Sequence, residues 1–360
     1  MSLKALIVDD TVTYRKILSN VIRDLPDVEA IGTAPNGSIA LKKMEQNQVD
    51  LVLLDIVMPG MDGIETLKRM KDKFTCAEVV MVSGVSEKAA EITIQALKIG
   101  ALEFVRKPEG GDVQANTREL RTILSPIIRM VLTRLIVRGV IKGTSTRPPE
   151  TKKPVAREAV PRPAPVPERF DVLAIGTSTG GPHALNEVIP KLPGDFPLPI
   201  VLVQHMPPKF TAALARDLNK RSELSVVEAS EHLPVKAGTV IIARGGYHMV
   251  VAKTGNGPVI RLNEGPPENS CRPSVDVLFR SVADVYGEQG VLSVIMTGMG
   301  NDGVSGIKTL KRKACYCITQ NKQSCVVYGM PRLVDEAGLS DKSVDLENIA
   351  ATILGLVSGH

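Results

Sequence analysis

Short apolar runs alternate with amphipathic stretches along the first third of the chain. Five runs have the length of buried strands: residues 3–8, 28–34, 49–55, 78–83 and 102–105. Between the first two runs, Ile17, Leu18, Val21 and Ile22 recur at helical spacing. Continuously apolar strands that alternate with helices predict a parallel sheet covered on both faces.

A long apolar stripe at helical spacing then runs from Leu120 to Ile136 and contains Pro126, which can kink or start part of a helix. The alternation resumes near residue 170. Further strands are expected at 170–176, 198–205, 238–243 and 290–298, and helices at 208–220 and 303–313. The predicted fold class is α/β, with a parallel sheet in the N-terminal domain and a doubly wound, mostly parallel sheet in the C-terminal domain.

The segment between the two patterns is rich in proline and charge. Residues 138–169 hold eight basic and three acidic residues, so they carry the whole net charge of +5. Such a composition does not build a packed core and predicts an extended linker. We therefore expect domains at 1–125 and 170–360, joined by a helix extension and linker at 126–169. Because the excess charge lies in the linker, a nucleic-acid-binding surface is not predicted.

Composition adds two expectations. Hydrophobic residues make up 43% of the 360 residues, and no apolar run approaches the roughly 18 to 20 residues of a membrane span. The first residues read as a strand rather than a signal peptide, which predicts a cytoplasmic protein without membrane insertion. There are five cysteines and no CxxC pair; Cys315 and Cys317 share one face of an expected strand, which favours buried reduced thiols over a metal site.

The first candidate site lies at the strand ends of the N-terminal domain, where the chemistry of parallel sheets collects. Polar residues follow four of the strands: Asp9, Asp10, Asp55, Ser83 and Lys107. Any one carboxylate alone is usually a strand-end cap. Converging carboxylates repel unless a cation joins them, and oxygen ligands suit Mg²⁺. The hydroxyl and the lysine are suited to hold a phosphoryl group on an aspartate.

This set, with MPGMDG at 58–63, resembles the receiver domains of two-component signalling. The resemblance implies a flavodoxin-like fold for residues 1–125. It also implies that Asp55 accepts phosphate from a phosphohistidine of a kinase. It implies Mg²⁺ bound by Asp9, Asp10, Asp55 and the backbone carbonyl of Val57. It also implies that Ser83 and Lys107 contact the phosphoryl oxygens.

The second candidate site begins with GTSTGG at 176–181, directly after an expected strand. A serine at such a turn, here Ser178, exposes its hydroxyl as in a nucleophile elbow. A glycine-rich phosphate cradle is the alternative, although neither the P-loop nor the dinucleotide fingerprint is met.

A nucleophilic serine needs a base and a group that orients the base. His205 ends an apolar strand and is the first candidate base, with His248 in reserve, whereas His183 is expected to point away. Asp302, in TGMGNDG at 297–303, is expected at the same sheet edge. The chain order Ser, His, Asp differs from that of the α/β-hydrolases.

These motifs, with QHMP at 204–207, RPSVDVLF at 272–279 and YGMPR at 328–332, resemble the chemotaxis protein-glutamate methylesterases, the CheB family. The resemblance covers nearly the full chain. It implies Ser178 as nucleophile, His205 as base, Asp302 as orienter, and the backbone amides of His205 and Met299 as oxyanion donors. RPSVDVLF is interpreted as structural. Arg244 and Tyr247 depart from the expected family pattern and leave the substrate preference open.

The resemblance implies a phosphorylation-activated response regulator that hydrolyses glutamate γ-methyl esters and deamidates glutamines on chemoreceptors, with Mg²⁺ in the receiver and no cofactor for the esterase. Its partners would be methyl-accepting receptors and the chemotaxis histidine kinase. We further hypothesise that the unphosphorylated receiver covers the Ser178 cleft. Two rival functions are a transcriptional response regulator, which the strand and serine turn disfavour, and a non-catalytic binding module.

Overall fold

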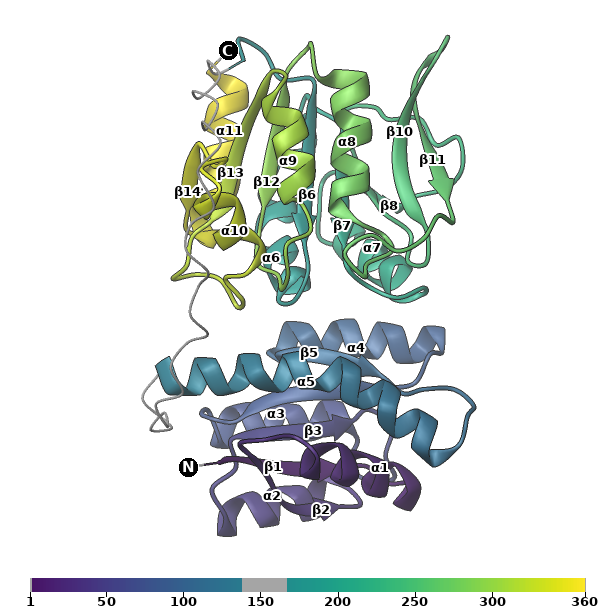
Figure 1. Cartoon of the computed structure of the whole chain (residues 1–360), viewed down its shortest axis with the longest axis vertical. Helices are drawn as coiled ribbons and strands as arrows, with labels where there is room; N and C mark the ends of the chain where they lie inside the picture. The colour runs from purple at the N-terminus through teal and green to yellow at the C-terminus, as the bar shows by residue number, and fades with distance from the viewer. Residues whose placement is uncertain (1, 138–166, 360) are drawn as a thin grey trace. The chain divides into compact units, whose positions relative to one another are not determined.

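A computed structural model describes residues 2–137 and 167–359 of the protein (Figure 1). Contacts divide the chain into two compact units, Met1–Ala156 and Arg157–His360. Most of the predicted linker, residues 138–166, lies outside the described residues. None of the helices within the described ranges has the length and apolar content needed to span a bilayer.

The first unit is a five-stranded parallel sheet in the order β2-β1-β3-β4-β5. Its strands are β1 Leu3–Val8, β2 Val28–Ala34, β3 Leu51–Asp55, β4 Glu78–Ser83 and β5 Glu103–Arg106. This is the flavodoxin-like order, as predicted. The expected strands at 3–8, 28–34 and 78–83 match β1, β2 and β4 residue for residue.

Five helices cover the two faces of this sheet. They are α1 Val12–Arg23, α2 Gly37–Gln46, α3 Gly63–Lys73, α4 Glu87–Ile99 and α5 Val113–Val137. Helix α1 packs against α5 on one face, and α2, α3 and α4 are neighbours on the other. Helices α2, α3 and α4 are capped at their N-termini by Asn36, Asp62 and Ser86, respectively. The side chain of each capping residue accepts a hydrogen bond from a backbone N–H in the first turn of its helix.

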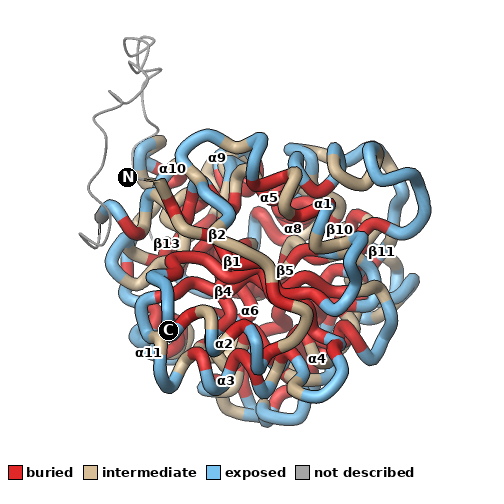
Figure 2. The backbone as a smooth tube through the Cα atoms, turned by 90° about the horizontal axis from the view of Figure 1, so that it is seen from below, coloured by how far each residue is buried: buried red, intermediate tan, exposed pale blue. Residues whose placement is uncertain are grey.

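The burial pattern follows the layers. Strands β1 and β4 are buried almost throughout, whereas the outer faces of the helices are exposed (Figure 2). The predicted stripe from Leu120 onward belongs to α5, which continues through Pro126 to Val137. Leu120 and Leu124 of this helix are fully buried.

The second unit contains a seven-stranded sheet in the order β14-β13-β12-β6-β7-β9-β8. All of its pairings are parallel, as predicted. The strands are β6 Val172–Thr177, β7 Ile200–Gln204, β8 Ser225–Glu228, β9 Thr239–Ile242, β12 Val291–Ile295, β13 Cys315–Gln320 and β14 Lys342–Val344. Strand β6 is central, and the chain adds strands first on one side of it and later on the other.

Helices again lie on both faces. They are α6 Gly181–Val188, α7 Phe210–Asn219, α8 Val275–Tyr286, α9 Val304–Lys311, α10 Met330–Glu336 and α11 Leu346–Ser358, with the short 3₁₀ helix η1 Ile189–Lys191. Helices α8, α9 and α10 contact one another in series, and α6 contacts both α7 and α11. An antiparallel hairpin, β10 His248–Thr254 and β11 Gly257–Asn263, packs on α8 through β10 and was not predicted.

Candidate active site and phosphoacceptor site

The carboxylates predicted in the first unit meet a lysine. Lys107 Nζ lies 2.8 Å from Asp9 Oδ2 and 2.8 Å from Asp55 Oδ2. Asp9 and Asp55 are buried at the carboxyl ends of the neighbouring strands β1 and β3. The lysine therefore neutralises part of the negative charge that these strand ends concentrate.

The same edge has the donor set that Mg²⁺ prefers. Asp9, Asp10 and Asp55 each offer a carboxylate oxygen, and these oxygens lie within 4.8 Å of one another. Asp10 is exposed, so one side of the group is open to solvent. Val57, a residue that is 66% exposed, follows Asp55 by two positions in the adjoining loop. Oxygen donors with open positions fit Mg²⁺, which keeps several waters in protein sites.

Asp55 lies in a buried setting that disfavours its charged form. Burial raises the pKa of Asp55 to about 6, although the charge of Lys107 and its hydrogen bond oppose the rise. Asp55 Oδ1 accepts the amide of Ile56 at 2.8 Å. A cation at this edge would favour the carboxylate form, which is the nucleophilic form.

Ser83 lies at the end of β4, fully buried. Its Oγ accepts a hydrogen bond from Thr93 Oγ1 at 3.0 Å and donates to the Gly84 carbonyl at 3.1 Å. Sequence reasoning did not single out Thr93 or Tyr14. The Tyr14 ring lies 4.8 Å from Lys107 Nζ, and its hydroxyl donates to the Pro108 carbonyl at 2.7 Å.

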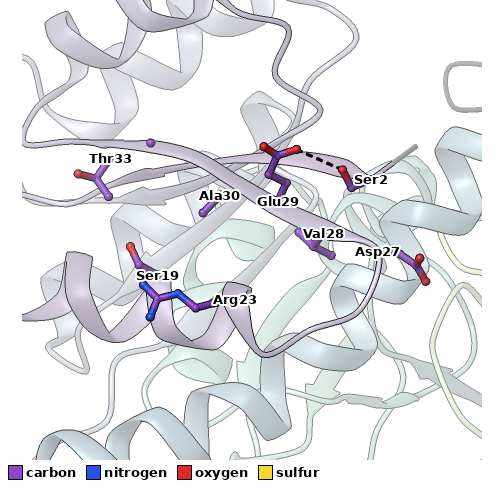
Figure 3. Close-up of a pocket in the computed structure, with 9 residues that line it drawn as sticks. Ser2, Ser19, Arg23, Asp27, Val28, Glu29, Ala30 and Thr33 are labelled. Carbon is purple, nitrogen blue, oxygen red and sulfur yellow. Dashed lines mark hydrogen bonds between the residues drawn. The ribbon is translucent and has the colours of Figure 1, made fainter.

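An open hollow of about 570 Å³ lies elsewhere on this unit, beside β2 and α1 (Figure 3). Arg23, Asp27 and Glu29 line it, and Glu29 accepts a hydrogen bond from Ser2. It contains none of the predicted site residues.

In the second unit, the predicted serine, histidine and aspartate all follow the carboxyl ends of adjacent strands. Ser178 follows β6, His205 follows β7, and Asp302 lies in the loop after β12. From β6 the chain adds β7, β8 and β9 on one side of the sheet, and it later adds β12, β13 and β14 on the other side. The direction in which strands are added therefore reverses at β6. Ligand sites of open α/β sheets occur at such a switch point.

Asp302 is bonded to His205. Its Oδ2 lies 2.7 Å from His205 Nε2, and both side chains are largely removed from solvent. Four further donors surround the carboxylate: the Val275 and Asp276 amides, Ser274 Oγ and Asn269 Nδ2. Burial opposes ionisation, but His205 and these hydrogen bonds outweigh it and hold the pKa of Asp302 well below its usual range.

The RPSVDVLF motif supplies three of those donors. Ser274 begins α8, and the first amides of that helix point at Asp302. A carboxylate at a helix N-terminus is stabilised by the unpaired amides and the helix dipole. The motif was interpreted as structural, and its contacts show that it positions the expected orienter.

The bond to Asp302 decides which nitrogen of His205 can act as a base. An ionised carboxylate only accepts hydrogen bonds, so Nε2 keeps its proton, and in the neutral imidazole the lone pair is on Nδ1. Burial lowers the pKa of His205, but bonds to Asp302 and to Cys271 raise it to about 9. Cys271 Sγ lies 3.6 Å from Nδ1, which the sequence did not suggest.

The Ser178 turn is packed tightly. The Ser178 amide donates to the Thr297 carbonyl at 3.0 Å, and Gln204 Nε2 donates to the carbonyls of Ser178 and His205 at 3.0 and 3.2 Å. A Cβ on Gly298 would lie 2.8 Å from Ser178 Cβ. Glycine at 298 therefore permits the approach of the β12 loop to the serine. Within the described residues, no hydrogen bond joins Ser178 Oγ to His205.

The two amides expected as oxyanion donors differ in their partners. The His205 amide donates to the Thr177 carbonyl at 3.2 Å, so it continues the pairing of β6 and β7 and is not a free donor. The Met299 amide has no acceptor in the described parts of the chain. The two amides differ because the pairing of β6 with β7 continues one residue past Gln204 and so uses the His205 amide.

The other three histidines of the described ranges, His183, His232 and His248, are not brought to this site. His183 is exposed, and His232 bonds to Arg261 at 3.0 Å. His248, the reserve candidate, is buried with Nε2 3.0 Å from the Pro266 carbonyl. Arg244 stacks on Tyr247, with its guanidinium 5.0 Å from the ring.

Known proteins match the chain over its whole length. The family profile described as CheB methylesterase matches residues 173–353, and the response regulator receiver domain profile matches residues 5–116. A protein-glutamate methylesterase/protein-glutamine glutaminase of Desulfotalea psychrophila is 42% identical over 99% of this chain and 99% of its own. The chain belongs to the CheB methylesterase family.

Two further relatives agree with this membership. A protein of the same name from Halalkalibacterium halodurans is 40% identical over 98% of this chain and 97% of its own. The crystal structure of the Thermotoga maritima CheB methylesterase catalytic domain covers 53% of this chain and 99% of that one, with a TM-score of 0.51 and 39% identity. The predicted family and the enzyme class are thereby confirmed.

Proposed function

We propose that this chain is a phosphorylation-activated response regulator that hydrolyses glutamate γ-methyl esters on chemoreceptors and deamidates receptor glutamines. The observation that carries the proposal is the bond of 2.7 Å between His205 Nε2 and Asp302 Oδ2, at the sheet edge that also presents Ser178. The family membership and the names of the relatives support the choice of substrate.

In the first step, Ser178 Oγ attacks the ester carbonyl while its proton passes to His205 Nδ1. Asp302 stabilises the imidazolium through Nε2–H. The Met299 amide is the proposed donor to the oxyanion, a contact that is typically worth about 3 to 4 kcal/mol. When the tetrahedral intermediate collapses, the C–O bond to the methoxy group breaks, and methanol leaves with the proton from Nδ1.

In the second step, water attacks the acyl-serine and gives its proton to Nδ1. The acyl C–O bond to Ser178 breaks, Oγ regains the proton, and the glutamate carboxylate is released. A glutamine side chain follows the same course with ammonia as the leaving group, which accounts for deamidation.

In the receiver, Asp55 Oδ attacks the phosphorus of a phosphohistidine as the P–N bond breaks. Asp9, Asp10, Asp55 and the Val57 carbonyl would hold Mg²⁺, which supplies charge neutralisation at the phosphoryl group. Ser83 and Lys107 then contact the phosphoryl oxygens. Lys107 Nζ already lies 2.8 Å from Asp55 Oδ2, so it is close enough to contact a phosphoryl group on that residue.

The proposal also couples the two sites. We expect the unphosphorylated receiver, residues 1–125, to cover the cleft of Ser178, and phosphorylation to favour an uncovered arrangement. Removal of residues 1–138 should then raise the basal esterase rate. A lower rate in a folded fragment would contradict the covering. The enzyme and its kinase and receptor partners are expected to meet in the cytoplasm.

Methanol release from methylated receptor, with and without Mg²⁺ and a small phosphodonor, tests the function directly. We expect release that rises with the donor and disappears in Ser178→Ala. Release that ignores the donor would retain the esterase and reject the switch. Activity in the pathway that survives Ser178→Ala, with no methanol released by the parent, would favour a non-catalytic binding module.

A further inference from the structure

The thiol of Cys271 has no part in the proposed ester hydrolysis, although it lies 3.6 Å from His205 Nδ1. The residue is half-buried, so solvent ions can reach it. Nδ1 is the nitrogen that must take the proton of Ser178. Cys271 and Ser178 thus compete for one lone pair.

The backbone holds the thiol in place. Cys271 and Glu268 exchange two backbone hydrogen bonds of 2.9 and 3.1 Å. Arg280, on α8, anchors the Glu268 carboxylate with a hydrogen bond of 2.7 Å. The helix that orients Asp302 therefore also fixes the loop that carries Cys271.

His205 has the arrangement of a metal-ligating histidine. One ring nitrogen donates its hydrogen to a buried carboxylate, Asp302, at 2.7 Å. In the neutral imidazole, the other nitrogen has its lone pair toward the thiol. Histidines that bind zinc almost always donate their second N–H in this way, which fixes the tautomer and makes the ligand more basic. Asp302 already accepts five hydrogen bonds, so it suits the role of partner behind the ligand.

The spacing of the two ligand atoms fits a tetrahedral ion. Zn–S bonds of about 2.3 Å and Zn–N bonds of about 2.05 Å at the tetrahedral angle place S and N about 3.6 Å apart. Cys271 Sγ and His205 Nδ1 are separated by 3.6 Å. One ion can therefore contact both atoms without a large movement of either side chain.

We propose that Cys271 Sγ and His205 Nδ1 form a binding site for Zn²⁺ or a similarly soft divalent cation. On binding, the thiol loses its proton to solvent and an S–Zn bond forms, while water or a substrate carboxylate completes the coordination. Thiolate and imidazole select such ions over Mg²⁺, which favours the carboxylates of the receiver. If Ser178 and His205 act as proposed above, the bound ion occupies the lone pair that the base needs, and the esterase is inhibited.

Binding can be measured separately from activity. The full-length protein, reduced with a phosphine and kept in excess Mg²⁺ to occupy the receiver, would be titrated with Co²⁺. Cobalt replaces zinc in such sites and reports a thiolate ligand by its near-ultraviolet charge-transfer absorption. We expect this absorption in the parent and in Cys76→Ala, a control that removes an exposed thiol of the first unit. We expect its loss in Cys271→Ala, in Cys271→Ser and in His205→Gln.

Methanol release with added Zn²⁺ tests the consequence, with each variant compared with its own metal-free rate. We expect inhibition of about tenfold or more in the parent and in Cys76→Ala, and none in Cys271→Ser. Charge-transfer absorption that persists in both Cys271 variants, or is absent from the parent, would overturn the site. Equal inhibition of the parent and of Cys271→Ser by Zn²⁺ would refute the inhibitory role of the metal site. A parent that binds Co²⁺ through Cys271 but releases no methanol would refute the proposed function and leave the metal site standing.

Discussion

Asp302→Asn isolates the contribution of the orienting carboxylate. The carboxylate accepts hydrogen bonds from His205 Nε2, from two backbone amides of α8, and from the side chains of Ser274 and Asn269. An asparagine amide has nearly the same shape but only one acceptor atom. Its NH₂ group must replace either Oδ2, which accepts from His205 Nε2 and the Val275 amide, or Oδ1, which accepts from the Asp276 amide, Ser274 Oγ and Asn269 Nδ2.

Both orientations disturb the site. If the NH₂ group faces His205, Nε2 has to accept, the proton moves to Nδ1, and the base has no lone pair toward Ser178. If it replaces Oδ1, it opposes the N–H of the Asp276 amide, and this pair of donors without an acceptor costs about 1 to 3 kcal/mol of folding free energy. The wrong tautomer in serine hydrolases lowers kcat about 10³- to 10⁴-fold, which corresponds to about 4 to 5.5 kcal/mol of transition-state stabilisation.

The assay is methanol release under saturating substrate, with a thermal melt of each variant to establish that it is folded. Asp284→Asn is the matched control, because Asp284 is an exposed residue of α8. We expect the control to keep its rate within about twofold of the parent, because substitutions of exposed residues outside buried hydrogen-bond networks usually change protein stability little. A folded Asp302→Asn variant with less than about a tenfold loss of kcat would refute the role assigned to the carboxylate.

Three further outcomes follow from the same geometry. Since the base must be neutral and the pKa of His205 is raised to about 9, kcat/KM should rise with pH and level off only near that value; a plateau below pH 7 would contradict this. Gly298→Ala places a Cβ 2.8 Å from Ser178 Cβ, which should displace the nucleophile. We expect kcat to fall roughly 100-fold with little change in KM. An unchanged kcat would show that the turn can adapt. Asp55→Asn should keep basal methanol release and lose its stimulation by a phosphodonor, and stimulation that survives would place the phosphoacceptor elsewhere.

Local patterns in the sequence determined the elements that carry both sites. Largely apolar runs predicted strands at 3–8 and 198–205, and the polar residues Asp9 and His205 marked their carboxyl ends. Parallel strands share one carboxyl edge, so Ser178, His205 and Asp302 could be expected together before any contact was known. These conclusions depend on periodicity and chain direction, which neighbouring residues determine.

Only the tertiary structure decided how those residues are connected. The order of the seven strands, the packing of β10 on α8, the α8 amides on Asp302 and the Cys271 thiol at His205 all depend on contacts between residues far apart in the chain. The use of the His205 amide in strand pairing likewise depends on Thr177, which belongs to another strand. Such contacts depend on how the helices and the sheet pack against one another, and the periodicity of apolar residues does not predict that packing. The tautomer of the base is a consequence of packing alone.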